Sequence, residues 1–170
     1  MQKIYSTYYA SPVGHLRISC NETCITELHF LNKEEPQSTA ATSGAPPVLQ
    51  QCVEELIEYF QGQRKKFEVP VYHGGTPFQL RVWNELLNIP YGKTISYLTF
   101  AKRLGDPKAI RAAASANGKN NIAIIVPCHR VIGSNNDLVG YGGGLWRKRW
   151  LLEMETKITY GVQTLFDREV

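Results

Sequence analysis

The segment ISYLTFAKRLGDPKAIRAAASANG, residues 95–118, determines the fold of the second half of the chain. Its first part, ISYLTFAKRLG, predicts a short helix that ends at Gly105. Asp106 and Pro107 are a favourable pair for the start of a second helix, which the sequence predicts through PKAIRAAASANG. Two short helices joined by a tight glycine turn form a helix-turn-helix.

The second of these helices is almost free of bulky side chains. Its small residues are Ala109, Ala112, Ala113, Ala114, Ser115 and Ala116. Many helix pairs bind nothing, but a helix this smooth can approach the groove of a nucleic acid closely. Basic residues around it are candidate contacts to phosphates, which position a protein without reading sequence. They are Lys102, Arg103, Lys108, Arg111 and Lys119.

Charge is distributed unevenly along the 170 residues, whose net charge is +4. Residues 1–76 hold six basic and eight acidic residues, whereas residues 77–170 hold 13 basic and seven acidic ones. A basic second half is consistent with a polyanionic partner, although many soluble domains carry such a surface. The Gly-Gly-Thr-Pro stretch predicts a boundary between an N-terminal domain at 1–76 and a basic C-terminal domain at 77–170, for which DNA is a candidate partner.

The first half predicts a small α/β domain. KIYSTYYASPVG and HLRISCNETCITELHFL are rich in β-branched and aromatic residues and predict an antiparallel meander. The polar stretch 32–47 predicts a loop, and VLQQCVEELIEYF, residues 48–60, predicts an amphipathic helix. The fold class is therefore α+β.

The composition excludes several classes of protein. With 43% hydrophobic and 20% charged residues the chain is neither disordered nor fibrous, and no apolar run approaches the ~20 residues of a membrane span. The N-terminus has no export signal, so we expect a cytoplasmic protein whose four cysteines are thiols. His15, Cys20, Cys24 and His29 are zinc-ligand types, but their spacing fits no closed zinc motif, and we expect no metal and no other cofactor.

The segment IAIIVPCHRVIG, residues 122–133, provides a candidate nucleophile. Its apolar run predicts a buried strand that ends at Pro127 and places Cys128 beside His129 and Arg130. An imidazole and a cation are what a thiol needs to become a reactive thiolate, although a buried cysteine is more often a packing residue. Glu153 or Glu155, on the helix that follows, could complete a Cys-His-acid relay.

Together, IPYGKTISY, the alanine-rich helix with Arg111, IVPCHRVIG, GYGGG and RKRWLLEME resemble the O6-alkylguanine-DNA alkyltransferases. The resemblance covers residues 77–155, while residues 1–76 agree mainly in SPVG and in the order of strands and helix. It implies a ribonuclease-H-like first domain and a mainly helical, winged-helix-like second domain. It also implies repair of DNA by irreversible transfer of an alkyl group from O6 of guanine to Cys128, once per protein molecule.

The resemblance assigns the chemistry to particular residues. His129 deprotonates Cys128 through a water, Glu155 holds the imidazole, and Asn120 braces the active-site turn. Tyr97 crowds the phosphate beside the flipped nucleotide and supplies a proton to the leaving guanine. The backbone at Cys128 and Val131 accepts from the guanine amino group. Tyr141 and Gly142 line the pocket near O6.

The same resemblance implies binding in the minor groove of double-stranded DNA, with the damaged nucleotide rotated out of the duplex. Arg111 matches the arginine that fills the vacated stack, and Ala112 and Ala113 belong to the smooth helix beside it. Lys108 and Lys119 are the flanking phosphate contacts. Simpler interpretations remain open, with Tyr97 as a core aromatic and Arg111 as an ordinary phosphate contact.

Position 142 is glycine where many members of this family carry serine, so we expect a roomier pocket that accepts larger alkyl groups. O4-alkylthymine is a further candidate substrate. We expect a monomer that can cluster on DNA. Two other functions remain alternatives: a lesion sensor without catalysis, against which Cys128 argues, and a cysteine hydrolase, which would turn over.

Overall fold

The computed structural model describes residues 2–31 and 44–161. The chain divides into two compact units, one formed by Met1–His73 with Asn121–Ile125 and the other by Gly74–Asn120 with Val126–Val170. The division at His73 lies close to the boundary that the sequence predicts after Thr76, but the return of residues 121–125 to the first unit was not predicted. Most of the expected loop at 32–47 lies outside the described residues.

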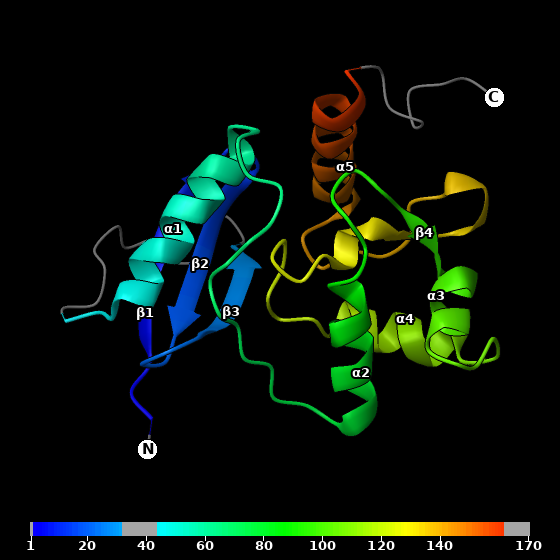
Figure 1. The fold of residues 1–170 in the computed structure, drawn as a ribbon, viewed down its shortest axis with the longest axis horizontal. Helices are drawn as coiled ribbons and strands as arrows, with labels where there is room; N and C mark the ends of the chain where they lie inside the picture. Colours follow the sequence, from blue (N-terminus) through cyan, green and yellow to red (C-terminus); the bar gives the residue numbers. More distant parts are fainter. Residues whose placement is uncertain (1, 32–43, 162–170) are drawn as a thin grey trace. The chain divides into compact units, whose positions relative to one another are not determined.

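The first unit is an antiparallel sheet covered by one helix (Figure 1). Strands β1 (Tyr5–Ser11), β2 (Gly14–Cys20) and β3 (Ile25–Phe30) follow one another in that order, and α1 (Pro47–Phe60) packs on all three. The predicted meander and helix are confirmed. Apolar residues at alternating strand positions and at helical spacing meet between the two layers because both element types have one apolar face. The fully buried ones include Leu16, Ile18, Leu28, Leu56 and Tyr59.

Cys24 is not part of a β-strand. It lies in the turn between β2 and β3, where its backbone N–H donates to Oδ1 of Asn21 at 2.8 Å. Cys20 is buried at the end of β2. Among residues 2–31 and 44–161, no group of three or more His, Cys, Asp or Glu side chains is placed to hold a metal ion.

The free edge of β3 is extended by a segment from much later in the chain. Leu28 N–H donates to the carbonyl of Asn121, and Ala123 N–H donates back to the carbonyl of Leu28, both at 2.9 Å. The predicted strand up to Pro127 is wrong, because only Ile122 forms a β-bridge and the chain then turns at Ile124, whose φ is +69°. An apolar run is compatible with a buried turn as well as with a strand.

The second unit contains the helix-turn-helix. Helix α2 (Pro77–Leu86) begins with a capping box between Thr76 and Gln79, and it packs against α4 (Ile110–Gly118), which also packs against α3 (Tyr97–Arg103). Helix α4 begins three residues later than predicted. Asp106 does not cap it, because the Asp106 carboxylate instead accepts from the backbone N–H of Lys108 and shapes the turn.

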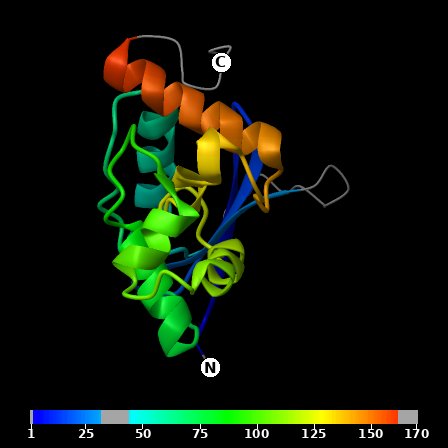
Figure 2. The same cartoon turned by 90° about the vertical axis from the view of Figure 1, so that its right-hand side faces the viewer.

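The remaining elements of this unit surround the cysteine segment. A short parallel pair joins β4 (Ile95–Ser96) to β5 (Val131–Ile132), and single turns of 3-10 helix occur at η1 (Cys128–Arg130) and η2 (Ser134–Asn136). Figure 2 shows α5 (Leu145–Tyr160) as one continuous helix. It therefore extends past Glu155 into the tail that the resemblance did not cover, and ends at Gly161, whose φ is +67°. No helix in the described parts of the chain is long and apolar enough to cross a membrane.

Candidate active site

The cysteine lies in a tight, buried turn within the second unit. Cys128 is the first residue of η1, and its side chain and those of His129 and Arg130 are all buried. The amide of Asn120 donates to the carbonyl of Val126 at 2.8 Å, which ties the approach to this turn to the end of α4. The position of Asn120 therefore fits the bracing role expected for it.

Burial of the Cys128 thiol raises its pKa above the ordinary value, since the charged form loses contact with water. A hydrogen bond with Asn120, the charge of Lys148 and nearby backbone N–H groups act in the opposite direction and lower that pKa. Burial is the largest of these effects. The resting residue is therefore a thiol, and it needs a base to become a nucleophile.

The candidate for that base is the neighbouring imidazole. His129 Nε2 lies 2.7 Å from Oε2 of Glu155, and burial lowers the pKa of His129, so the ring is neutral at neutral pH. Because a neutral imidazole facing a carboxylate donates from Nε2, its Nδ1 carries the lone pair. Nδ1 is buried and has no hydrogen-bond partner among the described residues. This nitrogen is thus free to take a proton.

Glu155 is 1% exposed, and its carboxylate contacts His129 and Arg130 and accepts from the backbone N–H of Gly92 at 3.3 Å. Besides His129, Arg130 contacts it through Nε at 2.8 Å and Nη2 at 3.2 Å. Burial alone would raise the pKa of Glu155, but His129 and Arg130 together hold it well below its ordinary value. Glu153, the other candidate for this position, instead pairs with Arg149 at 2.7 Å on a more exposed part of the helix.

Tyr97 and the cysteine turn are linked by one side chain. Asn117, which is 5% exposed, donates through Nδ2 to the Tyr97 hydroxyl at 2.9 Å and to the Cys128 carbonyl at 3.3 Å. Burial raises the pKa of Tyr97, while the hydrogen bond from Asn117 acts to lower it. Tyr97 is therefore protonated at neutral pH and has hydrogen-bonding surroundings rather than a purely apolar core.

Lys148 lies on the side of α5 that faces the cysteine segment. Its Nζ donates to the carbonyls of Val131 at 2.7 Å, Val139 at 2.8 Å and Gly140 at 3.3 Å. Burial lowers its pKa to about 8, and Cys128 acts to raise it. Lys148 thus ties β5 to the start of the glycine-rich loop, residues 140–144, and places a positive charge near the thiol.

The glycine-rich loop supplies the other expected pocket residues. Tyr141 is half-buried, and burial raises its pKa well above the ordinary value, so its hydroxyl stays protonated. Gly142 is exposed, and a Cβ added there would have no atom within 4 Å. Val131 is buried, and its carbonyl, although it accepts from Lys148, retains a second lone pair for a ligand.

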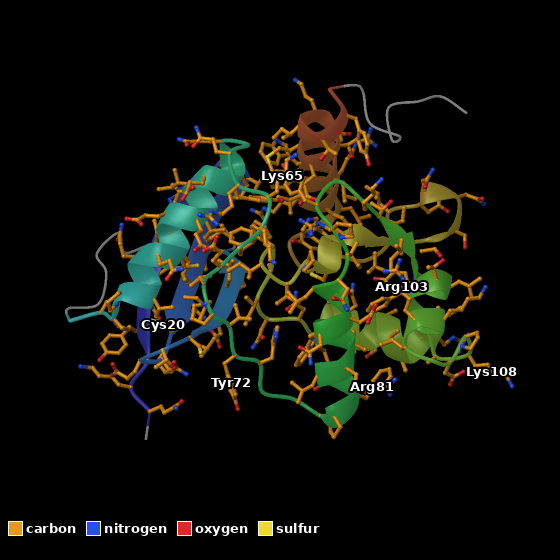
Figure 3. All side chains as sticks on the ribbon, in the orientation of Figure 1. Cys20, Lys65, Tyr72, Arg81, Arg103 and Lys108 are labelled. Carbon is orange, nitrogen blue, oxygen red and sulfur yellow. The ribbon has the colours of Figure 1, made fainter. Side chains whose placement is uncertain are left out.

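The helix-turn-helix surface contains most of the expected DNA contacts. Arg111, Ala112 and Lys119 are exposed on α4 or at its end, and Figure 3 shows Lys108 on the loop that joins α3 and α4. Ala113 is different: its side chain is fully buried, so it packs inside the unit and cannot form part of a DNA-facing surface. Successive residues of a helix are rotated by about 100°, so Ala112 and Ala113 point into different surroundings.

Two buried side chains of the site, Asn117 and Lys148, were not singled out as catalytic or binding residues from the sequence. Arg130, the cation that the sequence places beside Cys128, instead pairs with Glu155, and the charge that acts on Cys128 is that of Lys148. A signal for Lys148 does exist, because it precedes Leu151, Leu152 and Glu155 at helical spacing and so belongs to the apolar stripe of α5. The same spacing favours Glu155 over Glu153. Asn117 has no comparable signal.

A thiol beside an imidazole-carboxylate pair, in a unit built around a helix-turn-helix, defines a DNA-binding protein with a nucleophilic cysteine. The family described as "6-O-methylguanine DNA methyltransferase, DNA binding domain" matches residues 77–157, and the ribonuclease-like domain of the same family matches residues 4–72. The chain belongs to the O6-methylguanine DNA methyltransferase family.

Relatives cover nearly the whole chain. It is 45% identical over 157 residues to the methylated-DNA--protein-cysteine methyltransferase of Mycobacterium tuberculosis H37Rv, which spans 92% of this chain and 95% of that protein. The constitutive enzyme of the same name from Bacillus subtilis is 43% identical, covering 92% and 97%. The crystal structure of Mycobacterium tuberculosis OGT in complex with DNA is similar with a TM-score of 0.81 and 44% identity, covering 91% of this chain and 93% of that one.

Proposed function

We infer that this protein repairs DNA by transferring a methyl group from O6 of guanine to Sγ of Cys128. The observation that carries this inference is the buried thiol of Cys128 beside His129, whose Nε2 is 2.7 Å from Glu155 and whose Nδ1 is unpartnered among the described residues. The names of the relatives in Mycobacterium tuberculosis and Bacillus subtilis describe transfer from methylated DNA to a protein cysteine. DNA is accordingly the partner.

The reaction proceeds as a displacement at the methyl carbon. His129 Nδ1, through one water, takes the Sγ proton of Cys128, and the thiolate forms an S–C bond while the C–O6 bond breaks. The bonding electrons leave with O6, and Tyr97 supplies a proton to the guanine ring so that neutral guanine is released. Tyr97 and His129 then return to their resting forms by proton exchange with solvent. The product is a thioether.

The thioether makes the reaction irreversible, because no described group is placed to hydrolyse it. One protein molecule therefore repairs one lesion. The carbonyls of Cys128 and Val131 accept from the guanine amino group, and Tyr141 and Gly142 line the pocket near O6. The open space beside Gly142 supports acceptance of alkyl groups larger than methyl, and O4-alkylthymine is a second substrate.

Binding of duplex DNA falls to the helix-turn-helix of residues 97–118, which approaches the minor groove. Arg111 fills the stack left by the flipped nucleotide, Ala112 permits close approach, and Lys108 and Lys119 contact phosphates. A protein that works through a reduced thiol requires a reducing compartment, which favours the cytoplasm. We expect the protein to act as a monomer that can cluster on DNA.

The decisive experiment is the intact mass of the protein after incubation with a duplex that contains O6-methylguanine. The expected result is one added methyl group per molecule, absent in Cys128→Ser and never exceeding one equivalent. An unchanged mass with the lesion bound would identify a lesion sensor instead. An unchanged mass with repeated loss of the lesion would identify an enzyme that turns over, and either outcome would overturn the proposal.

A further inference from the structure

The amide of Asn117 lies between two groups that the proposed reaction uses. Its Nδ2 is 2.9 Å from the hydroxyl oxygen of Tyr97 and 3.3 Å from the carbonyl oxygen of Cys128. Asn117 is buried near the C-terminal end of α4, so the amide is held away from bulk water. One side chain therefore connects the proton donor with the turn that carries the nucleophile.

The direction of these hydrogen bonds follows from the chemistry of the partners. A carbonyl oxygen can only accept, so the amide must present its NH₂ group, and not Oδ1, to Cys128. With the opposite orientation, two acceptor oxygens would face each other. The same NH₂ group then has only one way to bond with Tyr97, which is by donating to the hydroxyl oxygen.

A constraint on Tyr97 results from this orientation. Because its oxygen accepts from Asn117, its own O–H hydrogen cannot point toward Asn117 and must be donated elsewhere. The donated hydrogen bond also stabilises a phenolate, and it opposes the rise in the pKa of Tyr97 that burial causes. Both effects prepare the hydroxyl to give up its proton.

We propose that Asn117 is a positioning residue that sets Tyr97 as a proton donor toward the leaving guanine by donating to its hydroxyl oxygen. This inference rests on the proposed function. Asn117 acts through Tyr97 and does not touch the reacting atoms. Its second hydrogen bond, to the Cys128 carbonyl, keeps the amide in the required orientation.

The test compares Asn117→Leu and Asn117→Asp with the wild type. Leucine has a similar size and forms no hydrogen bond, whereas an ionised aspartate can only accept and so reverses the bond to Tyr97. We expect both variants to slow single-turnover transfer from an O6-methylguanine duplex roughly ten- to a hundredfold, part of the 10² to 10⁴ range of general-acid catalysis. Wild-type transfer rates in both variants would overturn the proposal.

Two further measurements separate this role from a structural one. Alkylation of Cys128 by iodoacetamide needs no protonated leaving group, so we expect its rate in Asn117→Leu to stay within about twofold of wild type. In a Tyr97→Phe background, Asn117→Leu should add no more than about a twofold further loss. Two outcomes would mean that Asn117 only supports the fold. One is a loss of iodoacetamide reactivity in Asn117→Leu as large as its loss of methyl-transfer rate. The other is the same loss of methyl-transfer rate from Asn117→Leu in the Tyr97→Phe background as in the wild type.

The wild-type protein in the same assay separates failure of this inference from failure of the proposed function. If the wild type acquires no methyl group, the proposed function is wrong. If the wild type is methylated and the Asn117 variants match it, only the role of Asn117 is wrong.

Discussion

At the scale of single residues, the carboxylate of Glu155 connects catalysis with stability. It is almost fully buried and is shared by His129 and Arg130, whereas Glu153 pairs with Arg149 at a more exposed position of the same helix. Glu155→Gln keeps the size of the side chain but leaves the Arg130 charge without its counter-ion. Glu153→Gln is therefore a matched control within α5.

We expect Glu155→Gln to lower the free energy of unfolding by about 3–5 kcal/mol, the cost of breaking a buried ion pair, and to slow methyl transfer roughly a hundredfold. Denaturant unfolding and single-turnover kinetics measure the two effects. Glu153→Gln should change stability by less than about 1 kcal/mol, because exposed pairs contribute little. Equal effects of the two substitutions would show that the buried carboxylate has no special role.

The same residue gives the stability a pH dependence of defined sign. The pKa of Glu155 is lowered by folding, so its contribution is complete above the unfolded value of about 4.3 and is lost as the pH falls below it. The pKa of His129 is also lowered, so stability declines further as the pH falls below about 6.5, where the unfolded imidazole takes up a proton. We therefore expect the free energy of unfolding, measured from pH 7 to pH 3, to fall less in Glu155→Gln than in the wild type.

Gly142 is the residue that we propose sets the width of the pocket near O6. Gly142→Ser should fold normally, with a stability change within about 0.5 kcal/mol, because the added Cβ meets no atom within 4 Å. The hydroxyl narrows the pocket, so we expect transfer from O6-benzylguanine to slow about tenfold relative to O6-methylguanine. Gly118→Ser, where a Cβ also has open space, is the control. An unchanged ratio of the two rates would refute the pocket assignment.

At the scale of elements, helix α4 places two neighbouring alanines in opposite surroundings. Ala113→Leu should lower stability by about 1–3 kcal/mol, because it adds volume to a fully packed position. Ala112→Leu lies on the exposed face, so it should leave thermal unfolding unchanged and slow repair of duplex DNA but not transfer from free O6-benzylguanine. A variant of Ala112 that repairs duplexes at the normal rate would argue against α4 as the DNA-facing helix.

The helix α1 was predicted well from the sequence because its apolar residues recur along one face. The segment 122–127 was mistaken for a strand because hydrophobicity marks burial but does not reveal the positive φ of Ile124. Buried charged residues were harder to predict from the sequence. A lysine in a helix is normally solvated, so Lys148 could be recognised only from its position on the stripe with Leu151 and Leu152. The place of Asn117 in the site depends on contacts between residues that are distant in sequence, and no local sequence pattern reveals such contacts.

At the scale of the whole molecule, the segment Asn121–Ile125 belongs to the first unit although it leads directly to the cysteine turn. Its backbone bonds to Leu28 on the edge of β3, and Ile122 and Ile124 are buried there. The first unit thus holds the segment that leads into the turn of Cys128. We therefore expect the first unit to contribute to repair by anchoring this segment.

A fragment that begins at Gly74 tests this role, because it retains every proposed catalytic residue and loses the partner of residues 121–125. Removing that partner exposes two isoleucines and leaves backbone groups of Asn121 and Ala123 unpaired, so we expect a lower unfolding temperature and slower methyl transfer than in the full chain. Leu28→Ala in the full chain is a milder change of the same contact. We expect it to lower the free energy of unfolding by about 2–5 kcal/mol because of the cavity it leaves. Thermal unfolding and intact-mass kinetics measure both. A fragment as stable and as active as the full chain would show that the cysteine turn is held by the second unit alone.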